Sequence, residues 1–336
     1  MIYLHWIQLL GFLGAQVNNT VLLVLIWVRA DRLFGNYKYV MALFSLYSLV
    51  YAWIEVITFP VMHSKVPMFI IFNDGRFKYY EWFGHILTCI YCGSFALCIS
   101  LLAVQFYYRY IVVCKPFLIH RIEGFRSLVL LIPPSLCYAA WHCIVMYGMS
   151  NTEEKQQHVA DELKLYYDED ASKVTFIALM FWKTGQNGEK IWQIDSLLAV
   201  VGCDLILIVC FTAILTCGVK IYSELRRAGG YMSVRARDIN RQIFMTLTLQ
   251  TVLPFLMMYC PVGLVITAPM FGIELGKFAN IDGLSVGVYP SLEPLIALFV
   301  IKDFRRTLLG QKDPKISVHT EITLEHYNAH RHTTTN

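Results

Sequence analysis

The stretch AVQFYYRYIVVCKP, residues 103–116, decides how this chain folds. It closes an apolar run that begins near Trp82 and contains no Lys, Arg, Asp or Glu before Arg109. A run of ~26 residues forms roughly 40 Å of helix, which crosses a bilayer with some tilt. The sequence therefore predicts a membrane-spanning helix that ends in a basic loop opened by Lys115 and Pro116. Arg109 lies among tyrosines at the end of this helix. It either anchors the helix at a membrane face or acts as a switch of the protein's conformation.

The composition extends this prediction to the whole chain. Of 336 residues, 57% are hydrophobic and only 15% are charged, whereas about a quarter of the residues of a soluble domain are charged. The first apolar stretch, to Val28, is too long for a signal-peptide core and has no basic leader, so we expect it to be retained as a span. Asn18-Asn19-Thr20 matches a glycosylation pattern, but its place inside this span argues against modification.

Seven apolar segments reach spanning length, and charged clusters separate them. They lie at about 2–28, 39–62, 82–113, 127–148, 195–222, 243–269 and 279–301. The sequence thus predicts an all-α membrane protein, a seven-transmembrane helix bundle. Residues 1–310 would form this domain, and residues 311–336 a disordered cytoplasmic tail.

The distribution of charge predicts the orientation. About two-thirds of the 28 lysines and arginines lie in the first, third and fifth gaps, at Arg109, or after Lys302. The positive-inside rule places these regions and the C-terminus in the cytoplasm, and an odd number of spans leaves the N-terminus outside. This is the orientation of a G-protein-coupled receptor.

The long outer loop, about 149–194, carries an acidic stretch at Asp161–Asp170. Such a stretch is typical of a solvated face; the alternative is a lid over a ligand entrance. Asn187-Gly188 lies between Thr175–Thr184 and Lys190–Ile194, which is a hairpin signal.

None of the ten cysteines lies in this outer loop. The disulfide that ties the third span to that loop in rhodopsin-like receptors therefore cannot form. Cys89 and Cys92 share a helix face, but no second pair with metal spacing accompanies them. We expect buried apolar thiols, and no metal or other cofactor.

Gly283-Leu284-Ser285-Val286-Gly287 matches the nucleophile elbow of serine hydrolases. That motif requires a strand, a sharp turn and a helix, whereas here it lies within an apolar helical span. Small residues that let helices pack closely are the better explanation, and we expect no enzymatic activity.

Glu55, Asp204, Asp282 and Glu293 are ionisable residues inside spans, each costing several kcal/mol unless paired or hydrated. They either form hydrogen-bond networks within the bundle or contact a ligand. Candidate ligand-lining residues in the outer half of the bundle are Glu55, Phe59, His85, Cys89, Asp204, Tyr259 and Asp282.

Basic residues gather on the cytoplasmic side. After the last span, Phe304 and Leu308 fall one helical turn apart, with Arg305 and Arg306 turned away, which predicts a short amphipathic helix at the membrane surface. The fifth gap adds six more cations between Lys220 and Arg241. This basic face is either an orientation signal alone or a contact surface for a G protein.

Four stretches resemble the nematode seven-transmembrane chemoreceptors of the serpentine receptor class r (Str) family. They are Gly35–Glu55 (GNYKYVMALFSLYSLVYAWIE), Ala103–Pro116, Gln250–Phe271 (QTVLPFLMMYCPVGLVITAPMF) and Tyr289–Leu308 (YPSLEPLIALFVIKDFRRTL). The resemblance implies a plasma-membrane receptor of sensory-neuron cilia that detects a small odorant or pheromone and signals through a heterotrimeric G protein.

The resemblance also implies residue roles. Tyr108-Arg109-Tyr110 takes the place of the DRY sequence of rhodopsin-like receptors, and Tyr289-Pro290 with Glu293-Pro294 takes that of NPxxY. The family usually has Asp where this chain has Glu293, so the carboxylate has a longer reach. The residues expected to act in switching or G-protein coupling are Tyr108, Arg109, Tyr110, Arg237, Arg241, Tyr289 and Arg305.

These observations combine into one expectation. A ligand in the outer half of the bundle would favour a state in which the sixth span, hinged near Pro254, moves at its inner end and releases Arg109. The expected partners are a small-molecule odorant, a heterotrimeric G protein and the lipid bilayer, and no nucleic acid. A peptide-binding receptor remains an alternative because of the acidic outer loop. A transporter or channel is less favoured, since inverted repeats are not evident.

Overall fold

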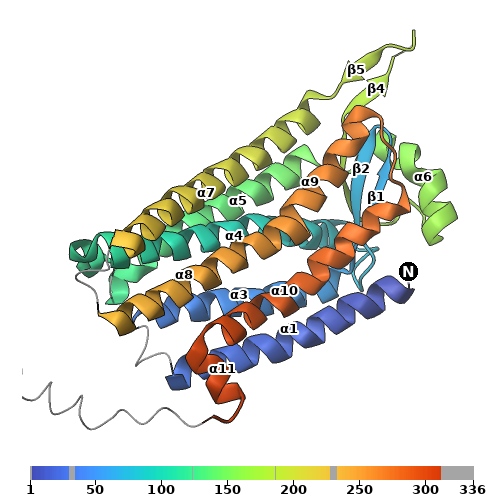
Figure 1. The fold of residues 1–336 in the computed structure, drawn as a ribbon. Coiled ribbons are helices and arrows are strands. Elements are labelled where there is room, and N and C mark those ends of the chain that lie inside the picture. The colour runs from blue at the N-terminus through green and yellow to red at the C-terminus, as the bar shows by residue number, and fades with distance from the viewer. Residues whose placement is uncertain (1, 30–34, 123, 186, 228–232, 312–336) are drawn as a thin grey trace, which may run out of the picture.

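The computed structural model describes residues 2–29, 35–122, 124–185, 187–227 and 233–311. Within these ranges, seven helical segments are long and apolar enough to cross a membrane, and they form one bundle (Figure 1). Their helices are α1 (Ile2–Arg29), α3 (Tyr37–Thr58), α4 (Glu81–Cys114), α5 (Ile132–Gly148), α7 (Ile194–Arg227), α8 (Val234–Pro254) with α9 (Cys260–Thr267), and α10 (Asn280–Val300). The predicted seven-helix fold is confirmed. The α4 helix packs against α3, α5, α7 and α8 and is the most deeply buried span.

Two spans differ in detail from the approximate ranges that the sequence predicts. The second span ends at Thr58 rather than near residue 62, because Phe59 adopts a left-handed conformation with φ 40° and Pro60 follows it. The fourth span begins with a 3₁₀ segment, Gly124–Leu131, before α5 starts at Ile132. Pro133 and Pro134 lie in the first turn of α5, where a missing N–H costs nothing, so they begin this helix rather than kink it.

The sixth span is interrupted in its middle. A π-helical turn, Phe255–Tyr259, separates α8 from α9, next to Pro254. Pro261 has no N–H to bond the carbonyl of Met257, and Ser285 Oγ donates to that oxygen instead, at 2.8 Å. Ser285, the centre of the elbow-like sequence, therefore links α10 to the break in the sixth span.

The α1 and α10 helices approach each other closely. A Cβ atom at Gly11 would lie 2.5 Å from the carbonyl oxygen of Gly287, so glycine is required at this contact. Pro294 cannot bond the carbonyl of Pro290, which instead accepts a hydrogen bond from Asn19 Nδ2 at 3.1 Å. The Asn18-Asn19-Thr20 pattern is thus explained inside the bundle, as its position in a span suggested.

An antiparallel sheet in the order β1-β2-β3 covers one end of the bundle. Its strands are β1 (Pro60–Lys65), β2 (Met68–Asn73) and β3 (Phe176–Met180). Side chains alternate along β2: Phe69 and Ile71 join the core of the bundle, whereas Ile70 and Phe72 pack with α6 (Glu153–Tyr167). We call this sheet together with α6 the lid, and Figure 1 shows it beside the N-terminus.

Asp161, Asp168 and Asp170 of the acidic stretch are exposed, as the first of the two interpretations predicts, but Glu162 and Glu169 are not. Much of the stretch forms the second half of α6, and two of its carboxylates hold the lid in place. Glu162 pairs with His63, which is fully buried in β1. Glu169 pairs with Lys78 and accepts a hydrogen bond from Tyr79 at 3.0 Å.

The remaining outer elements match the expected hairpin. Strands β4 (Trp182–Thr184) and β5 (Lys190–Trp192) pair antiparallel around Gly188, which has φ 82°. The sequence placed Phe176–Met180 in the first arm of this hairpin, together with Trp182–Thr184. In the structure these residues form β3 of the lid sheet instead.

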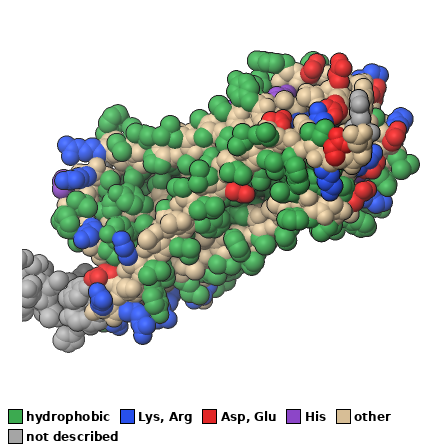
Figure 2. Space-filling model, turned by 90° about the horizontal axis from the view of Figure 1, so that it is seen from above, with side chains coloured by type: hydrophobic (Ala, Val, Ile, Leu, Met, Phe, Trp, Pro, Cys, Tyr) green, Lys and Arg blue, Asp and Glu red, His purple; other side chains and the backbone are tan. Residues whose placement is uncertain are grey.

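The two ends of the bundle differ in charge. Figure 2 shows mainly Lys and Arg at the end away from the lid, Asp and Glu mixed with Lys and Arg at the lid end, and mostly apolar side chains between them. A short helix, α11 (Lys302–Leu308), follows α10 with Phe304 buried, as predicted. The predicted disordered tail lies, from residue 312 on, outside the described residues.

Candidate functional site

A cavity of about 50 Å³ lies directly beneath the lid sheet, between α4, α5 and α9. We call it the outer cavity. Its lining is Met62, Phe69, Ile71, Cys92, Phe95, Trp141, Val145, Met149, Ile177, Ala178, Leu179, Val262 and Ile266. None of the described lining residues is charged. The cavity wall is therefore chemically suited to an apolar rather than a charged ligand.

Two of the predicted acidic side chains are buried in the outer half of the bundle. Glu55 and Asp282 are 3% and 4% exposed, and neither Glu55 Oε1 nor the two Asp282 oxygens has a hydrogen-bond partner among the described residues. Gln8 donates to the carbonyl of Pro60 at 3.2 Å. Glu55 also lies against Gly287, where a Cβ atom would come within 2.3 Å of Oε1. The structure thus buries two of the predicted ligand residues in the outer half of the bundle, and neither of them lines the outer cavity.

Two further predicted residues lie close to the cavity. Cys89 is buried one helical turn from Cys92, which lines it. Tyr259 is buried in the π-helical turn and donates a hydrogen bond to the carbonyl of Phe95 at 3.0 Å. Tyr259 therefore connects the break in the sixth span to a residue of the cavity wall.

The other three lie elsewhere. Asp204 is exposed on a face of α7 that points away from the bundle, so it does not pair with Glu55. The ring of Phe59 lies 4.6 Å from that of His5 on α1. His85 lines an open groove at the outer end of α4, together with Trp82 and Asn151.

At the opposite end of the bundle, Arg109 is 5% exposed and connects three helices. Its Nη2 donates to Asn240 Oδ1 of α8 at 3.2 Å. Its guanidinium lies 4.5 Å from the ring centre of Tyr37 in α3, and the ring of Tyr108 stacks on Tyr37 at 5.8 Å. The predicted switch residue therefore holds α4 to α3 and α8.

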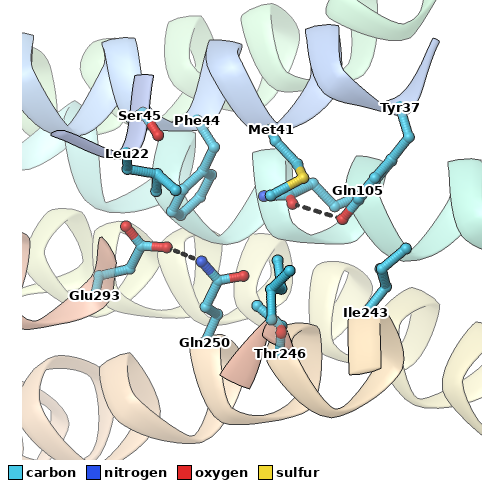
Figure 3. Close-up of a pocket in the computed structure, with 11 residues that line it drawn as sticks. Leu22, Tyr37, Met41, Phe44, Ser45, Gln105, Ile243, Thr246, Gln250 and Glu293 are labelled. Carbon is cyan, nitrogen blue, oxygen red and sulfur yellow. Dashed lines mark hydrogen bonds between the residues drawn. The ribbon is translucent and has the colours of Figure 1, made fainter. Parts of the chain in front are cut away.

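A second set of polar contacts lies between α3, α4, α8 and α10 (Figure 3). Gln250 of α8 hydrogen-bonds Glu293 of α10, and the Tyr37 hydroxyl donates to Gln105 Oε1 at 3.3 Å. Only about 10 Å³ of space remains among these residues, so they form a packing junction rather than a ligand site. The longer side chain of Glu293 accounts for its reach across to α8.

A third contact ties α8 to the helix after the last span. Lys302 Nζ pairs with Asp238 Oδ2 at 2.9 Å, and the Lys302 N–H donates to Gln242 Oε1 at 2.8 Å. We call the contacts of Arg109 with Asn240, of Gln250 with Glu293 and of Lys302 with Asp238 the inner network. All three include a residue of α8.

The remaining predicted switch residues are dispersed. Tyr110 lies under Lys220 Nζ of α7 at 5.4 Å, and the Tyr289 hydroxyl is 3.5 Å from Cys98 Sγ in the middle of the bundle. Arg237 and Arg241 are exposed where α8 faces α7. Arg305 is exposed on α11.

Sequence reasoning did not find the partners of Arg109 and Glu293. Asn240 and Gln250 are uncharged, whereas the prediction rested on ionisable groups inside spans. Gln250 is a polar residue inside the predicted sixth span and could have been recognised there, but Asn240 lies outside the predicted span, in the fifth gap. Tyr37 gave no such signal, because tyrosine is common at membrane interfaces.

This architecture is that of a multi-pass membrane receptor of the G-protein-coupled class. It has seven spans, a basic end that carries the inner network, the lid at the opposite end, and a short helix after the last span. Residues 4–309 match the family described as "Serpentine type 7TM GPCR chemoreceptor Str". The chain belongs to this family of seven-transmembrane chemoreceptors, which are not enzymes.

Individual relatives agree with this assignment. The chain is 32% identical over 305 residues to Serpentine receptor class r-10 of Caenorhabditis briggsae, covering 90% of this chain and 88% of the relative. It is 33% identical over 296 residues to Serpentine receptor class r-10 of Caenorhabditis elegans, covering 87% and 86%. G-protein coupled receptor str-33 of C. elegans is 25% identical over 301 residues, covering 89% and 87%.

Proposed function

We propose that this chemoreceptor binds a small apolar odorant or pheromone in the outer cavity and activates a heterotrimeric G protein at its basic end. One observation carries the proposal: the sixth span contributes to both places. Val262 and Ile266 of α9 line the outer cavity, and Asn240 and Gln250 of α8 belong to the inner network. The π-helical turn lies between them.

The proposed sequence of events follows from this arrangement. A ligand that fits the outer cavity better when α9 has shifted favours that state, and the break next to Pro254 lets α8 follow at its inner end. The inner network then opens, and Arg109 leaves Asn240 to meet the G protein. A ligand can shift this equilibrium only by its difference in affinity for the two states.

The energies are compatible with a small ligand. Moving a two-state equilibrium from 1:99 to 99:1 requires about 5.5 kcal/mol of differential affinity. The best very small ligands reach about 1.5 kcal/mol per non-hydrogen atom, so a ligand of six such atoms has at most about 9 kcal/mol. A full response therefore requires that most of the ligand's binding energy be specific for the active state.

We place the receptor in the plasma membrane of a sensory-neuron cilium, where a lid that faces outward meets the odorant and the basic end meets the G protein. Membership of a chemoreceptor family supports this location. Epitope tagging of the receptor in the animal tests it by showing whether the protein reaches cilia.

A calcium assay with a panel of volatile compounds, on cells that express the chain, tests the ligand site. Val262→Trp fills the outer cavity, and Leu264→Trp adds the same ring on the same helix, where Leu264 is 66% exposed. At equal surface expression, we expect Val262→Trp to lose the response to every agonist and Leu264→Trp to retain it. An unchanged response of Val262→Trp would show that the ligand binds elsewhere.

A further inference from the structure

A second hollow lies at the basic end, between the inner ends of α7 and α8, with a volume of about 1020 Å³. We call it the α7–α8 cleft. Its lining is Tyr222, Leu225, Arg226, Val234, Arg235, Arg237, Asp238, Arg241, Phe244, Met245 and Thr248. It takes no part in the outer cavity, and Asp238 is the single residue that it shares with the inner network.

The cleft has a cationic rim. Arg226, Arg235, Arg237 and Arg241 line it, and all four are exposed. Asp238 is the single carboxylate among the described lining residues, and it is already paired with Lys302 at 2.9 Å. The cleft therefore offers several arginines to an anion, and its one competing carboxylate is occupied.

The floor of the cleft is apolar and runs into the membrane. Tyr222 of α7 and Phe244 of α8 meet there with ring centres 6.3 Å apart. Met245, 54% exposed, and Thr248 continue the same surface of α8 toward the middle of the bilayer. A ligand that fills the cleft must carry a negative group at one end and a hydrocarbon chain at the other.

We propose that the α7–α8 cleft binds an anionic phospholipid of the inner leaflet. Its phosphate would lie between Arg226 and Arg241, and an acyl chain would lie along Phe244 and Met245. Arginine binds phosphate oxygens in a bidentate manner, and basic clefts between spans on the cytoplasmic side suit acidic headgroups. The bound lipid joins α7 to α8 and so restrains the inner end of the sixth span.

The geometry separates this site from the inner network, although Arg237 and Arg241, which the sequence assigned to switching or G-protein coupling, line the cleft. Asn240 and Gln250 point from α8 into the bundle, toward Arg109 and Glu293. Arg237 and Arg241 lie on the side of α8 that faces α7. A soluble anion would use the arginines alone and would leave the apolar floor exposed, which is why a lipid fits better than free phosphate.

Thermal unfolding of the purified full chain in neutral detergent tests the proposal. The probes are dioctanoyl phosphatidylinositol 4,5-bisphosphate, its free inositol trisphosphate headgroup, and dioctanoylglycerol. We expect the intact lipid to raise the unfolding temperature in a saturable way and the two fragments to have little effect. In Arg226→Gln/Arg241→Gln, the affinity for the intact lipid should fall about fivefold for each arginine removed.

Arg305→Gln/Arg306→Gln on α11 is the matched control, since it removes the same charge from the same end of the molecule. It should bind the lipid like the unmodified chain. Equal loss in both variants would overturn the proposal in favour of a diffuse charge effect, and equal binding of the free headgroup would overturn it in favour of a soluble-anion site. Normal lipid binding by the cleft variant, with loss of G-protein activation in neutral lipid, would assign these arginines to the G protein instead.

Discussion

Arg109 contacts two neighbouring helices through interactions that are weak enough for the proposed release. Its contacts are a hydrogen bond to the amide of Asn240 and the face of the Tyr37 ring, both of them neutral. A cation on an aromatic face gains roughly 2 kcal/mol when it is desolvated, and a hydrogen bond to a charged group about 1.5–3 kcal/mol. Contacts of this size hold the closed state, yet the binding energy of a small ligand can overcome them.

Replacement of Asn240 by Ala should raise signalling in the absence of ligand. The variant removes one charge-assisted hydrogen bond from the closed state, so the ratio of open to closed receptor should rise by roughly tenfold or more. G-protein activation without agonist, normalised to surface expression, measures this. Basal activity equal to that of the unmodified receptor would mean that Asn240 does not restrain α8.

Replacement of Arg109 by Ala should abolish agonist-dependent activation of the G protein. The receptor should reach the surface and bind agonist, but agonist should no longer activate the G protein, because the group that meets it is gone. Arg109→Lys, which keeps the charge without the planar guanidinium, should retain part of the response. If Arg109→Ala at the surface couples agonist to G protein normally, the switch role is wrong.

The Asn19 side chain should stabilise the fold through its hydrogen bond to the carbonyl of Pro290. Its replacement by Leu leaves the carbonyl of Pro290 without a donor in the bundle, which should lower the free energy of unfolding by about 1–3 kcal/mol. In a Pro294→Ala background the restored N–H can bond that carbonyl, so the cost of Asn19→Leu should be smaller. Equal costs in both backgrounds, measured by thermal unfolding in detergent, would contradict this account.

At the scale of elements, the sequence predicts the spans well and the lid poorly. Apolar runs such as Trp82–Tyr108 predict a membrane helix because length and hydrophobicity alone decide it. β1 continues the apolar run of the second span, so the predicted span includes its first residues, although the helix ends at Thr58 before Phe59 and Pro60. β3 is separated from β2 by more than 100 residues, and no local pattern reveals such a pairing.

The contacts at the edge of the lid should make its stability depend on pH. Burial alone would raise the pKa of Asp74, but hydrogen bonds from His5 and Lys78 lower it below its ordinary value. A carboxylate with a lowered pKa in the folded state adds stability above its unfolded pKa, about 3.9, and loses it as the pH falls through the folded pKa.

Asp74→Asn should therefore be less stable than the unmodified chain at pH 7, and the difference should shrink below about pH 4. Asp168→Asn is the control, since that side chain is 86% exposed and pairs only with Lys164 on the surface. A difference that stays constant from pH 7 to pH 3 would show that the Asp74 contacts do not stabilise the lid.

At the scale of the whole molecule, the two candidate sites lie at opposite ends of the sixth span. Sequence reasoning placed polar residues such as Glu55 and Asp282 in the outer half, and the structure buries both there. It did not find the outer cavity, because that cavity depends on helix rotation and on lid strands distant in the chain. Apolar residues such as Val262 carry no signal that separates a cavity wall from an ordinary core.

The distance between the inner ends of α4 and α8 tests the central claim most directly. Spin labels on unnatural amino acids at Arg121 and Arg235, both exposed, avoid the ten native cysteines. With a saturating agonist from the volatile panel, we predict that this distance increases by several ångströms, and that Val262→Trp abolishes the increase. An agonist that activates the G protein while the distance stays unchanged would contradict the account.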